Sequence, residues 1–209
     1  TLRDAAFTRQ ARQQGWDERI AAFAAGGGHV LGLCGGYQMM GERVDDPGGI
    51  EGPPGASEGL GLLPVRTVLA EDKQTIRTSA RLCLPGGPEV AGVEGYEIHA
   101  GLTEVDHGRA GGPVLAIEGS EGRRTDGVWS ADGQHAGTYL HGLFDEPAAT
   151  RTLLGWFRPG LTLTHEPSES AYAWRQRQYD LLADHLALHL DTGRLFALAG
   201  LAAPPPALT

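Results

Sequence analysis

Five consecutive residues, Gly32-Leu33-Cys34-Gly35-Gly36, place a cysteine between glycines at the spacing of a nucleophile on a sharp strand-to-helix turn. Glycines lack a Cβ, so they let such a strained turn close and let the strand approach the helix. The N-terminus of the following helix favours thiolate over thiol, and the N–H of Gly35 is placed to donate to an oxyanion. A lone cysteine in an apolar strand is usually a small buried hydrophobe, but the glycine pattern favours a nucleophile at Cys34.

A thiolate nucleophile needs a base that takes and returns protons, and the sequence contains eight histidines. His141 follows the apolar run 136–140 and precedes Gly142, so we expect it at the end of a strand. A strand end holds an imidazole firmly at the edge of a sheet, as a catalytic base requires. Spacing alone does not choose among His99, His135 and His141.

The second cysteine, Cys83, lies between Leu82 and Leu84 without flanking glycines, and we interpret it as a core residue. The sequence has no CxxC pair and no histidines at zinc-ligand spacing, and two cysteines do not make a disulfide framework. It also has no G-x-x-x-x-G-K-[ST] phosphate-binding loop. We therefore expect no metal and no cofactor in this chain, and a reducing cytoplasm as its location.

Composition fits a globular protein of 209 residues, of which 41% are apolar, enough for one domain with a sizeable core. The formal net charge of -9 argues against nonspecific binding to nucleic acid, which needs a basic surface. The sequence has no apolar run of about 18 residues, so we expect no membrane span. The residues after Thr1 do not resemble a signal peptide.

The elements that must position Cys34 follow from the pattern around it. A helix is predicted over 3–25, where Trp16, Ile20, Phe23 and Ala24 recur at helical spacing before three glycines. A short buried strand over residues 29–33 leads into the cysteine, and a helix over 37–44 leaves it. Residues 45–61 are rich in Gly, Pro and Asp and are predicted to form a surface loop.

The rest of the chain alternates strands with helices. Strands are predicted over 62–69, 74–84, 93–98, 113–117, 128–130 and 136–140, and helices over 148–157 and 170–190. The Asp-Gly in the sequence Ala-Asp-Gly-Gln between the last two strands predicts a hairpin. This mixture indicates an α/β layer architecture with its site at a strand-to-helix junction.

Three separate motifs resemble those of the cobyric acid synthases, a branch of the class I glutamine amidotransferases. They are the nucleophile motif Leu33–Gly41, the middle motif Tyr96–Gly101 and the histidine motif Gly137–Asp145, in the family's order. Residues Gly59–Pro64 and the helix containing 179–184 also fit. The resemblance runs from about residue 1 to about residue 198.

The resemblance implies an α/β domain of the flavodoxin-like type, with helices on both faces of a layered sheet and its N-terminal strands missing here. The amidotransferase domain would cover residues 1–198, with a flexible tail over 199–209. It would hydrolyse glutamine and pass ammonia to an ATP-dependent synthetase domain of the same polypeptide. That domain would amidate adenosylcobyrinic acid a,c-diamide, a corrinoid, on the route to cobalamin, and would bind ATP and Mg.

Residue roles follow from the motifs. The resemblance implies that Cys34 attacks the glutamine side-chain amide and forms a glutamyl thioester. His141 would protonate the leaving ammonia and then activate water. Gly35 N–H would be one oxyanion donor, and Gln38 matches the position that holds the substrate glutamine.

The remaining motif residues have less defined roles. Glu97 and His99 lie in the middle motif, and anchoring of a strand is the simpler interpretation of both. Many class I enzymes have a glutamate two residues after the catalytic histidine, but Leu143 stands at that position here, as it does in the cobyric acid synthases. The acid that orients the imidazole therefore stays open between Glu97, Asp145 and Glu146.

Several alternatives remain beside this interpretation. Related amidotransferases are cobyrinic acid a,c-diamide synthase and the glutaminase subunit that amidates lipid II. A thiol hydrolase or peptidase could use the same turn, and a truncated domain could be a non-catalytic module. In the family a Pro-Gly-Ser-Lys turn that contributes to the oxyanion hole precedes the position of Thr1, so we expect a fragment of a longer enzyme that lacks part of its site.

Overall fold

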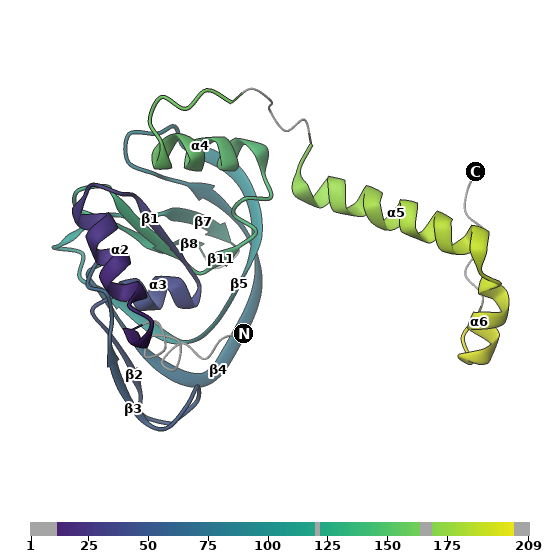
Figure 1. Ribbon diagram of the computed structural model, residues 1–209, viewed down its shortest axis with the longest axis horizontal. Coiled ribbons are helices and arrows are strands. Elements are labelled where there is room, and N and C mark those ends of the chain that lie inside the picture. The colour runs from purple at the N-terminus through teal and green to yellow at the C-terminus, as the bar shows by residue number, and fades with distance from the viewer. Residues whose placement is uncertain (1–11, 120–121, 164–168, 203–209) are drawn as a thin grey trace. The chain divides into compact units, whose positions relative to one another are not determined.

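The computed structural model describes residues 12–119, 122–163 and 169–202, and the chain falls into two compact units divided between residues 166 and 167 (Figure 1). The first unit contains all the described strands and the second contains the two C-terminal helices. The predicted boundary after residue 198 stays a prediction, and most of the predicted tail lies outside the described residues.

The first unit combines helices with many short strands and one long strand pair. Its helices are α2 (Trp16–Ala25), α3 (Gly35–Met40) and α4 (Pro147–Phe157). Its strands are β1 (Val30–Leu33), β2 (Arg43–Asp46), β3 (Gly55–Glu58), β4 (Val65–Leu82), β5 (Val90–Val105), β6 (Ala110–Gly112), β7 (Leu115–Gly119), β8 (Gly122–Asp126), β9 (Val128–Ser130), β10 (His135–Thr138) and β11 (Leu140–His141).

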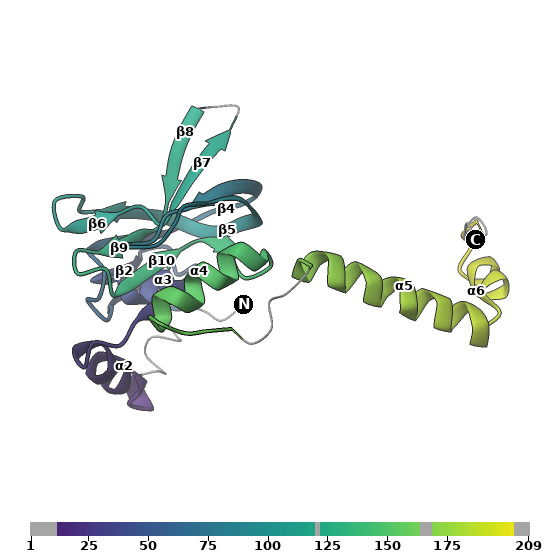
Figure 2. The same ribbon diagram turned by 90° about the horizontal axis from the view of Figure 1, so that it is seen from above.

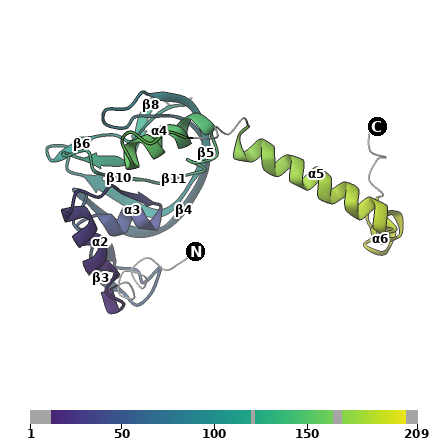
Figure 3. The same cartoon turned by 45° about the horizontal axis from the view of Figure 1, so that its top comes forward.

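The described strands form two sheets. One has the order β1-β10-β9-β6, and the other has the order β11-β5-β4-β2-β3 with β7 paired to β4 and β8 paired to β7. The pairs β1/β10 and β2/β4 are parallel, and the other described pairs are antiparallel. Helix α3 lies against β1 and β10, and α4 packs on β5 (Figure 3). The predicted α/β class is confirmed, as a multistranded sheet flanked by helices.

Strands β4 and β5 form one long antiparallel ribbon, from which the β7–β8 hairpin projects in Figure 2. The sequence predicted two separate strands over 62–69 and 74–84, and this was wrong. The pairing shifts register between Val68 and Lys73, which marks a bulge inside a continuous strand. A bulge interrupts the alternation of side chains, which is why the pattern divided this strand into two.

The segment after α3 differs from its prediction. The predicted helix over 37–44 ends at Met40, and β2 begins three residues later. Glu42 N–H donates to Val65 O at 2.8 Å, so the backbone bonds to β4 instead of continuing the helix. The predicted loop over 45–61 contains strand β3, which pairs with β2 despite the many glycines and prolines.

The other predicted elements were largely right. Helix 3–25 begins outside the described residues and is interrupted at Gly15, whose φ is 68°, before α2 continues to Ala25. Strand β1 and helix α4 match their predictions, and β9 and β10 form the predicted hairpin. In the turn of this hairpin, the Asp132 carboxylate accepts the N–H of Gln134 at 3.0 Å.

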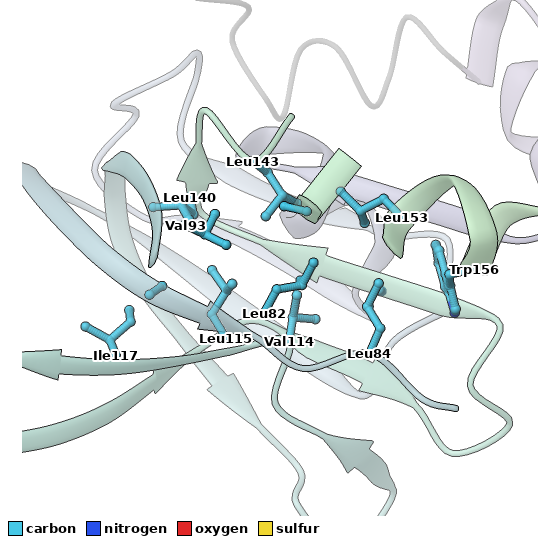
Figure 4. Close-up of a cluster of buried hydrophobic side chains, with 13 residues drawn as sticks. Leu82, Leu84, Val93, Val114, Leu115, Ile117, Leu140, Leu143, Leu153 and Trp156 are labelled. Atoms are coloured by element: carbon cyan, nitrogen blue, oxygen red, sulfur yellow. The ribbon is translucent and has the colours of Figure 1, made fainter. Parts of the chain in front are cut away.

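The main core lies between β4, β5, β7 and α4 (Figure 4). Its buried members come from five strands, the loops and α4, and the labelled ones are Leu82, Leu84, Val93, Val114, Leu115, Ile117, Leu140, Leu143, Leu153 and Trp156. A second cluster under α3 contains Tyr37, Met40, Leu63, Val65, Val128 and Tyr139. The strand segment that contains Tyr139 and Leu140 therefore contributes to both clusters, immediately before His141.

The second unit consists of α5 (Ala171–His189) and α6 (Thr192–Leu198). Helix α5 confirms the predicted helix 170–190, and its N-cap Ser170 accepts the N–H of Ala173 at 3.1 Å. Helix α6 was not predicted. Neither helix has a buried side chain among the residues that the structure describes, and Trp174 is 50% exposed. Within the described residues, no helix is both long enough and apolar enough to cross a membrane.

Candidate active site

Cys34 occupies the junction between β1 and α3 in a strained backbone conformation. Its φ is 53° and its ψ is -117°, and it is the one non-glycine residue with positive φ among the described residues. Its carbonyl accepts the N–H groups of Tyr37 at 2.9 Å and Gln38 at 3.3 Å, which closes the first turn of α3. Strain of this kind persists where the surroundings enforce it and is concentrated at functional sites.

The glycines around Cys34 have different steric roles. A Cβ on Gly32 would lie 2.6 Å from Gly36 O and 2.6 Å from Met40 Sδ, so the strand and helix approach too closely for any side chain there. A Cβ on Gly36 would meet no atom within 4 Å. The prediction that a glycine lets strand and helix approach therefore holds at Gly32, while Gly36 faces open space. Gly35 is the first residue of α3, next to the nucleophile, and its role as an oxyanion donor stays a prediction.

Two strands bring Cys34 and His141 to the same stretch of β5. Strand β1 pairs with β10, and Cys34 N–H donates to Thr138 O at 2.9 Å. The Cys34 thiol donates to Ile98 O on β5 at 3.3 Å. His141 pairs with Tyr96 on the same strand. Ile98, which accepts the thiol, and Tyr96, which pairs with His141, are two positions apart on β5, which is roughly 7 Å along a strand.

His141 has the geometry and electrostatics of a neutral base. Its ring stacks on Tyr96 with centroids 4.9 Å apart and planes within 3°. Its Nε2 is buried and has no hydrogen-bond partner among the described residues. Burial lowers the pKa of His141 below 6.5, because desolvation disfavours the imidazolium. A neutral imidazole can accept a proton from a thiol or a water that enters the site.

Of the other two histidines that the sequence left open, the structure moves His135 away from Cys34. His135 is at the start of β10 and pairs with Val30, at the opposite end of β1 from Cys34. His99, by contrast, follows Ile98 on β5 and, like His141, has a buried ring nitrogen without a partner among the described residues. It stacks on Tyr139, with centroids 4.0 Å apart. Burial is the main cause that lowers the pKa of His99, although nearby carboxylates oppose it.

Gln38 lies in the interior, with 2% of its surface exposed. Its Nε2 donates to the hydroxyl of Tyr139 at 3.1 Å, and Tyr139 also bonds to Thr103. The amide nitrogen is thus engaged by the protein, while the buried carbonyl oxygen Oε1 lacks a hydrogen-bond partner among the described residues.

Glu97, one candidate for the orienting acid, is engaged elsewhere. Arg124 donates hydrogen bonds to both oxygens of its carboxylate, and Thr78 donates to Oε1 at 2.9 Å. Burial would raise the pKa of Glu97, but the hydrogen bonds from Arg124 and Thr78 outweigh it and lower this pKa. Because side chains alternate along β5, Glu97 points to the opposite face from Tyr96, which stacks on His141. Glu97 therefore acts as a buried strand anchor.

Asp145 and Glu146, the other two candidates, follow His141 in the loop before α4. Asp145 N–H donates to Gly142 O at 2.8 Å. The Asp145 carboxylate turns back toward Gly142, since a Cβ built there would lie 3.7 Å from Oδ2. Glu146 is the N-cap residue of α4 and its side chain makes no capping bond. Of the two, Asp145 has its carboxylate near Gly142, the residue that follows His141.

Cys83 is not the core residue that the sequence predicted. It is partly exposed just after β4, its thiol approaches Arg81 O at 3.6 Å, and it lines a cavity of about 440 Å³ with Glu89. Burial and the neighbouring Glu89 raise the pKa of Cys83. The flanking leucines are buried, but strand alternation turns the residue between them to the other side.

Sequence reasoning missed the buried polar groups around the segment between β10 and β11. Asp126 accepts bonds from Thr138 and from Tyr139 N–H, and Arg124 reaches Glu97 from β8. The sequence signal available for Asp126 was its place before a glycine at the start of an apolar strand. That pattern also fits an ordinary surface turn, so it did not indicate a buried carboxylate.

Comparison with known proteins shows which family the sequence matches. Residues 3–149 match the family model for the CobB/CobQ-like glutamine amidotransferase domain. Two curated proteins named cobyric acid synthase, both from Rhodobacter capsulatus, are each 46% identical over 200 residues. Those matches cover 95% of this chain but 38% of each relative, so the chain spans less than half the length of the curated relatives it matches.

Solved structures show a weaker likeness. A crystal structure of a glutamine amidotransferase is 17% identical with a TM-score of 0.42, covering 73% of this chain and 74% of the other. The structure of PurLQS from Thermotoga maritima is 16% identical with a TM-score of 0.42, covering 68% of each chain. Membership of the family therefore follows from the sequence relatives and not from these structures.

Proposed function

We propose that this chain, which belongs to the CobB/CobQ-like glutamine amidotransferase family, is the domain that hydrolyses glutamine in a cobyric acid synthase. The observation that carries the proposal is the strained turn at Cys34. Its thiol donates to Ile98 O of β5, and Tyr96, two positions away on that strand, pairs with His141. A cysteine on a strained turn and a half-buried histidine with a lowered pKa, both held against the same strand, supply the nucleophile and the base that thiol catalysis needs.

In the first half of the reaction, the Cys34 sulfur attacks the side-chain amide carbon of glutamine. A C–S bond forms, the carbonyl oxygen becomes an oxyanion, and His141 holds the thiol proton. Collapse of this intermediate breaks the C–N bond while His141 returns the proton to the leaving nitrogen. The products are ammonia and a glutamyl thioester. The N–H of Gly35 is the proposed donor to the oxyanion.

In the second half, His141 takes a proton from water, whose oxygen attacks the thioester carbon. The C–S bond breaks, glutamate leaves, and the thiol regains a proton. Both halves require a neutral imidazole at the start, and burial favours this because it lowers the pKa of His141. The buried carbonyl Oε1 of Gln38 is a proposed contact for the amide end of the substrate.

Orientation of His141 in this proposal does not depend on an acid two residues later. Tyr96 covers one face of the ring in a parallel stack, and the backbone of β11 is fixed by pairing with β5. Asp145, in the following loop, is the acid we propose for the remaining ring nitrogen. This arrangement would fix the imidazole with Leu143 buried in the core instead of a glutamate at that position.

The role of the whole enzyme rests on the names of the relatives and on the motifs. We propose that the ammonia passes to a synthetase domain in the same polypeptide, which uses ATP and Mg to amidate a corrinoid carboxylate. The name cobyric acid synthase on both relatives supports this substrate over that of cobyrinic acid a,c-diamide synthase or of the lipid II enzyme. We place the enzyme in the cytoplasm, in line with its cysteine content.

Glutamate release from glutamine tests the proposal. We would measure it for the 209-residue chain and for a longer polypeptide with a synthetase domain, ATP, Mg and corrinoid present. Cys34→Ala is the test variant and Cys83→Ala is the matched control. Turnover that survives Cys83→Ala and is lost in Cys34→Ala supports the proposal. If no form hydrolyses glutamine, or if Cys34→Ala retains turnover, Cys34 is not the nucleophile and the glutaminase proposal is wrong.

A further inference from the structure

Asp126 is a buried carboxylate at the end of β8 that the mechanism above does not use. It is 8% exposed. Its Oδ2 accepts the hydroxyl of Thr138 and, at 3.0 Å, the backbone N–H of Tyr139. Both donors belong to the short segment where β10 ends and β11 begins. One carboxylate oxygen therefore fixes two consecutive residues of the chain.

The segment that Asp126 holds connects the nucleophile to the base. Thr138 O accepts the N–H of Cys34 at 2.9 Å, so Thr138 is hydrogen-bonded directly to the nucleophile's backbone. The Thr138 hydroxyl accepts the N–H of Leu140 at 3.1 Å, and Leu140 precedes His141. These bonds form a continuous path from the strained turn through Thr138 to the histidine.

The chain also changes sheets at this segment. Residue Thr138 ends β10, which pairs in parallel with β1, and Leu140 begins β11, which pairs antiparallel with β5. Between them, Tyr139 has no strand partner, so its N–H needs an acceptor in a buried place. Asp126 supplies that acceptor. The angle at which the chain leaves one sheet for the other sets the position of His141 relative to Cys34.

We propose that Asp126 is a positioning residue for the catalytic pair, which acts as a hydrogen-bond acceptor that fixes the crossing from β10 to β11. This inference rests on the proposed glutaminase function for its consequence, although its geometry stands without it. Asp126 reaches the reacting atoms only through Thr138 and Tyr139. Its loss would leave a buried hydroxyl and a buried N–H unsatisfied and let the segment shift.

The surroundings of Asp126 favour a geometric role over a role of its charge. Burial raises its pKa, and the bonds from Thr138 and Tyr139 oppose this only in part. Glu97 also raises that pKa, while His99 lowers it, and the phenol groups of Tyr37 and Tyr139 lie within its electrostatic reach. A neutral amide oxygen in the same place could accept the same two bonds.

Four variants, each made in the 209-residue chain and in the longer polypeptide with the synthetase domain, separate the possibilities. Asp126→Ala removes the acceptor and Asp126→Asn keeps one. Thr138→Val removes the hydroxyl without changing the size of the side chain much, and Thr138→Ser keeps the hydroxyl. Asp132→Ala is the matched control, because Asp132 caps the turn at the other end of β10 through a similar bond to a backbone N–H.

Two readouts are measured on each variant. The first is glutaminase kinetics, with kcat and KM separated. The second is the rate at which iodoacetamide alkylates Cys34, followed by peptide mass analysis between pH 5 and pH 9, on the order of the range in which imidazole and thiol titrate. Alkylation reports the coupling of thiol and imidazole without using glutamine, so it remains informative if the glutaminase proposal fails.

We expect Asp126→Ala to lower kcat by about 100-fold with little change in KM, the loss that a displacement of about 1 Å can cause. Asp126→Asn should stay within about tenfold of the parent, since it loses at most part of one hydrogen bond. Thr138→Val should lower kcat and Thr138→Ser should restore it. The alkylation profile of Cys34 should shift in Asp126→Ala and Thr138→Val and remain that of the parent in Asp132→Ala.

Three outcomes overturn the inference. Asp126→Ala with the parent's kcat and alkylation profile would show that the crossing needs no anchor. Equal losses in Asp126→Asn and Asp126→Ala would assign the effect to charge. If Asp126→Ala does not fold, unchanged kinetics and alkylation in Thr138→Val overturn the inference. If neither the 209-residue parent nor the longer polypeptide releases glutamate, the proposed function alone is contradicted, and the alkylation profiles still decide the role of Asp126.

Discussion

The two cysteines of this chain have the same side chain and similar partial exposure, yet the structure gives them opposite settings. Cys34 has a φ of 53° at the junction between β1 and α3, and its thiol donates to a main-chain carbonyl of β5. Cys83 follows an antiparallel strand, and burial and Glu89 raise its pKa. One thiol lies at a strained turn against β5, the strand that pairs with His141, and the other lies near a carboxylate.

The comparison shows that backbone context, more than side-chain burial, distinguishes a nucleophile from an ordinary thiol. Both residues follow a leucine in the sequence and both are partly exposed, so burial alone would not rank them. The close approach of β1 to α3 at Gly32 enforces the turn at Cys34. A carboxylate neighbour such as Glu89 disfavours a thiolate through repulsion, whereas the Cys34 thiol contacts Ile98 of β5, the strand that pairs with His141.

The largest expected difference between the cysteines is in catalysis. Cys34→Ala should reduce glutamate release by at least about 1,000-fold, because loss of a covalent nucleophile leaves only binding and oxyanion stabilisation. Cys83→Ala should stay within about twofold of the parent, as expected for a partly exposed residue away from the reacting atoms. The measurement is glutamate release at saturating glutamine. Comparable losses in both variants would remove the distinction between the two thiols.

His141 should produce the next largest effect. His141→Asn should lower kcat by about 10²- to 10⁴-fold, the usual contribution of a general acid–base. In the parent, kcat/KM should fall with decreasing pH as the neutral imidazole becomes protonated. Because burial lowers the pKa of His141, this fall should lie below the 6.5 of an exposed histidine. An acid limb centred above 6.5 would contradict this assignment of the base.

The strain at Cys34 can be tested with a matched pair of glycine variants. Gly32→Ala should destabilise the fold by about 1–3 kcal/mol, since overpacking forces β1 away from α3. Gly36→Ala should have a much smaller effect, because the space around it is open. Urea unfolding measures stability, and iodoacetamide labelling at Cys34 measures the turn. Equal destabilisation of both variants would show that the close approach at Gly32 does not maintain the turn.

Much of this site could be predicted from local sequence. The glycines around Cys34, the apolar run before His141 and the Asp-Gly hairpin each reflect a backbone need that a few neighbouring residues reveal. The anchor at Asp126 could not be predicted in this way, because its bonds depend on β8 meeting a segment a dozen residues later. The exposure of Cys83 was also missed, since two buried leucines flank a residue on the opposite face of a strand.

The smallest expected effect concerns the pKa of Cys83. Labelling with iodoacetamide near neutral pH should modify Cys34 well before Cys83, because burial and Glu89 raise the pKa of Cys83 and leave it protonated. Glu89→Gln removes the carboxylate but keeps its size, so Cys83 should then react at a somewhat lower pH than in the parent. Burial is the larger cause of the raised pKa of Cys83, so Glu89→Gln should remove only the smaller part of that increase. Peptide mass analysis of each cysteine across a pH series measures it, with Glu118→Gln, on the same cavity wall, as the control. If Cys83 reacts as readily as Cys34 in the parent chain, the local electrostatics do not separate the two thiols, and the strained turn alone would have to account for any difference in catalysis.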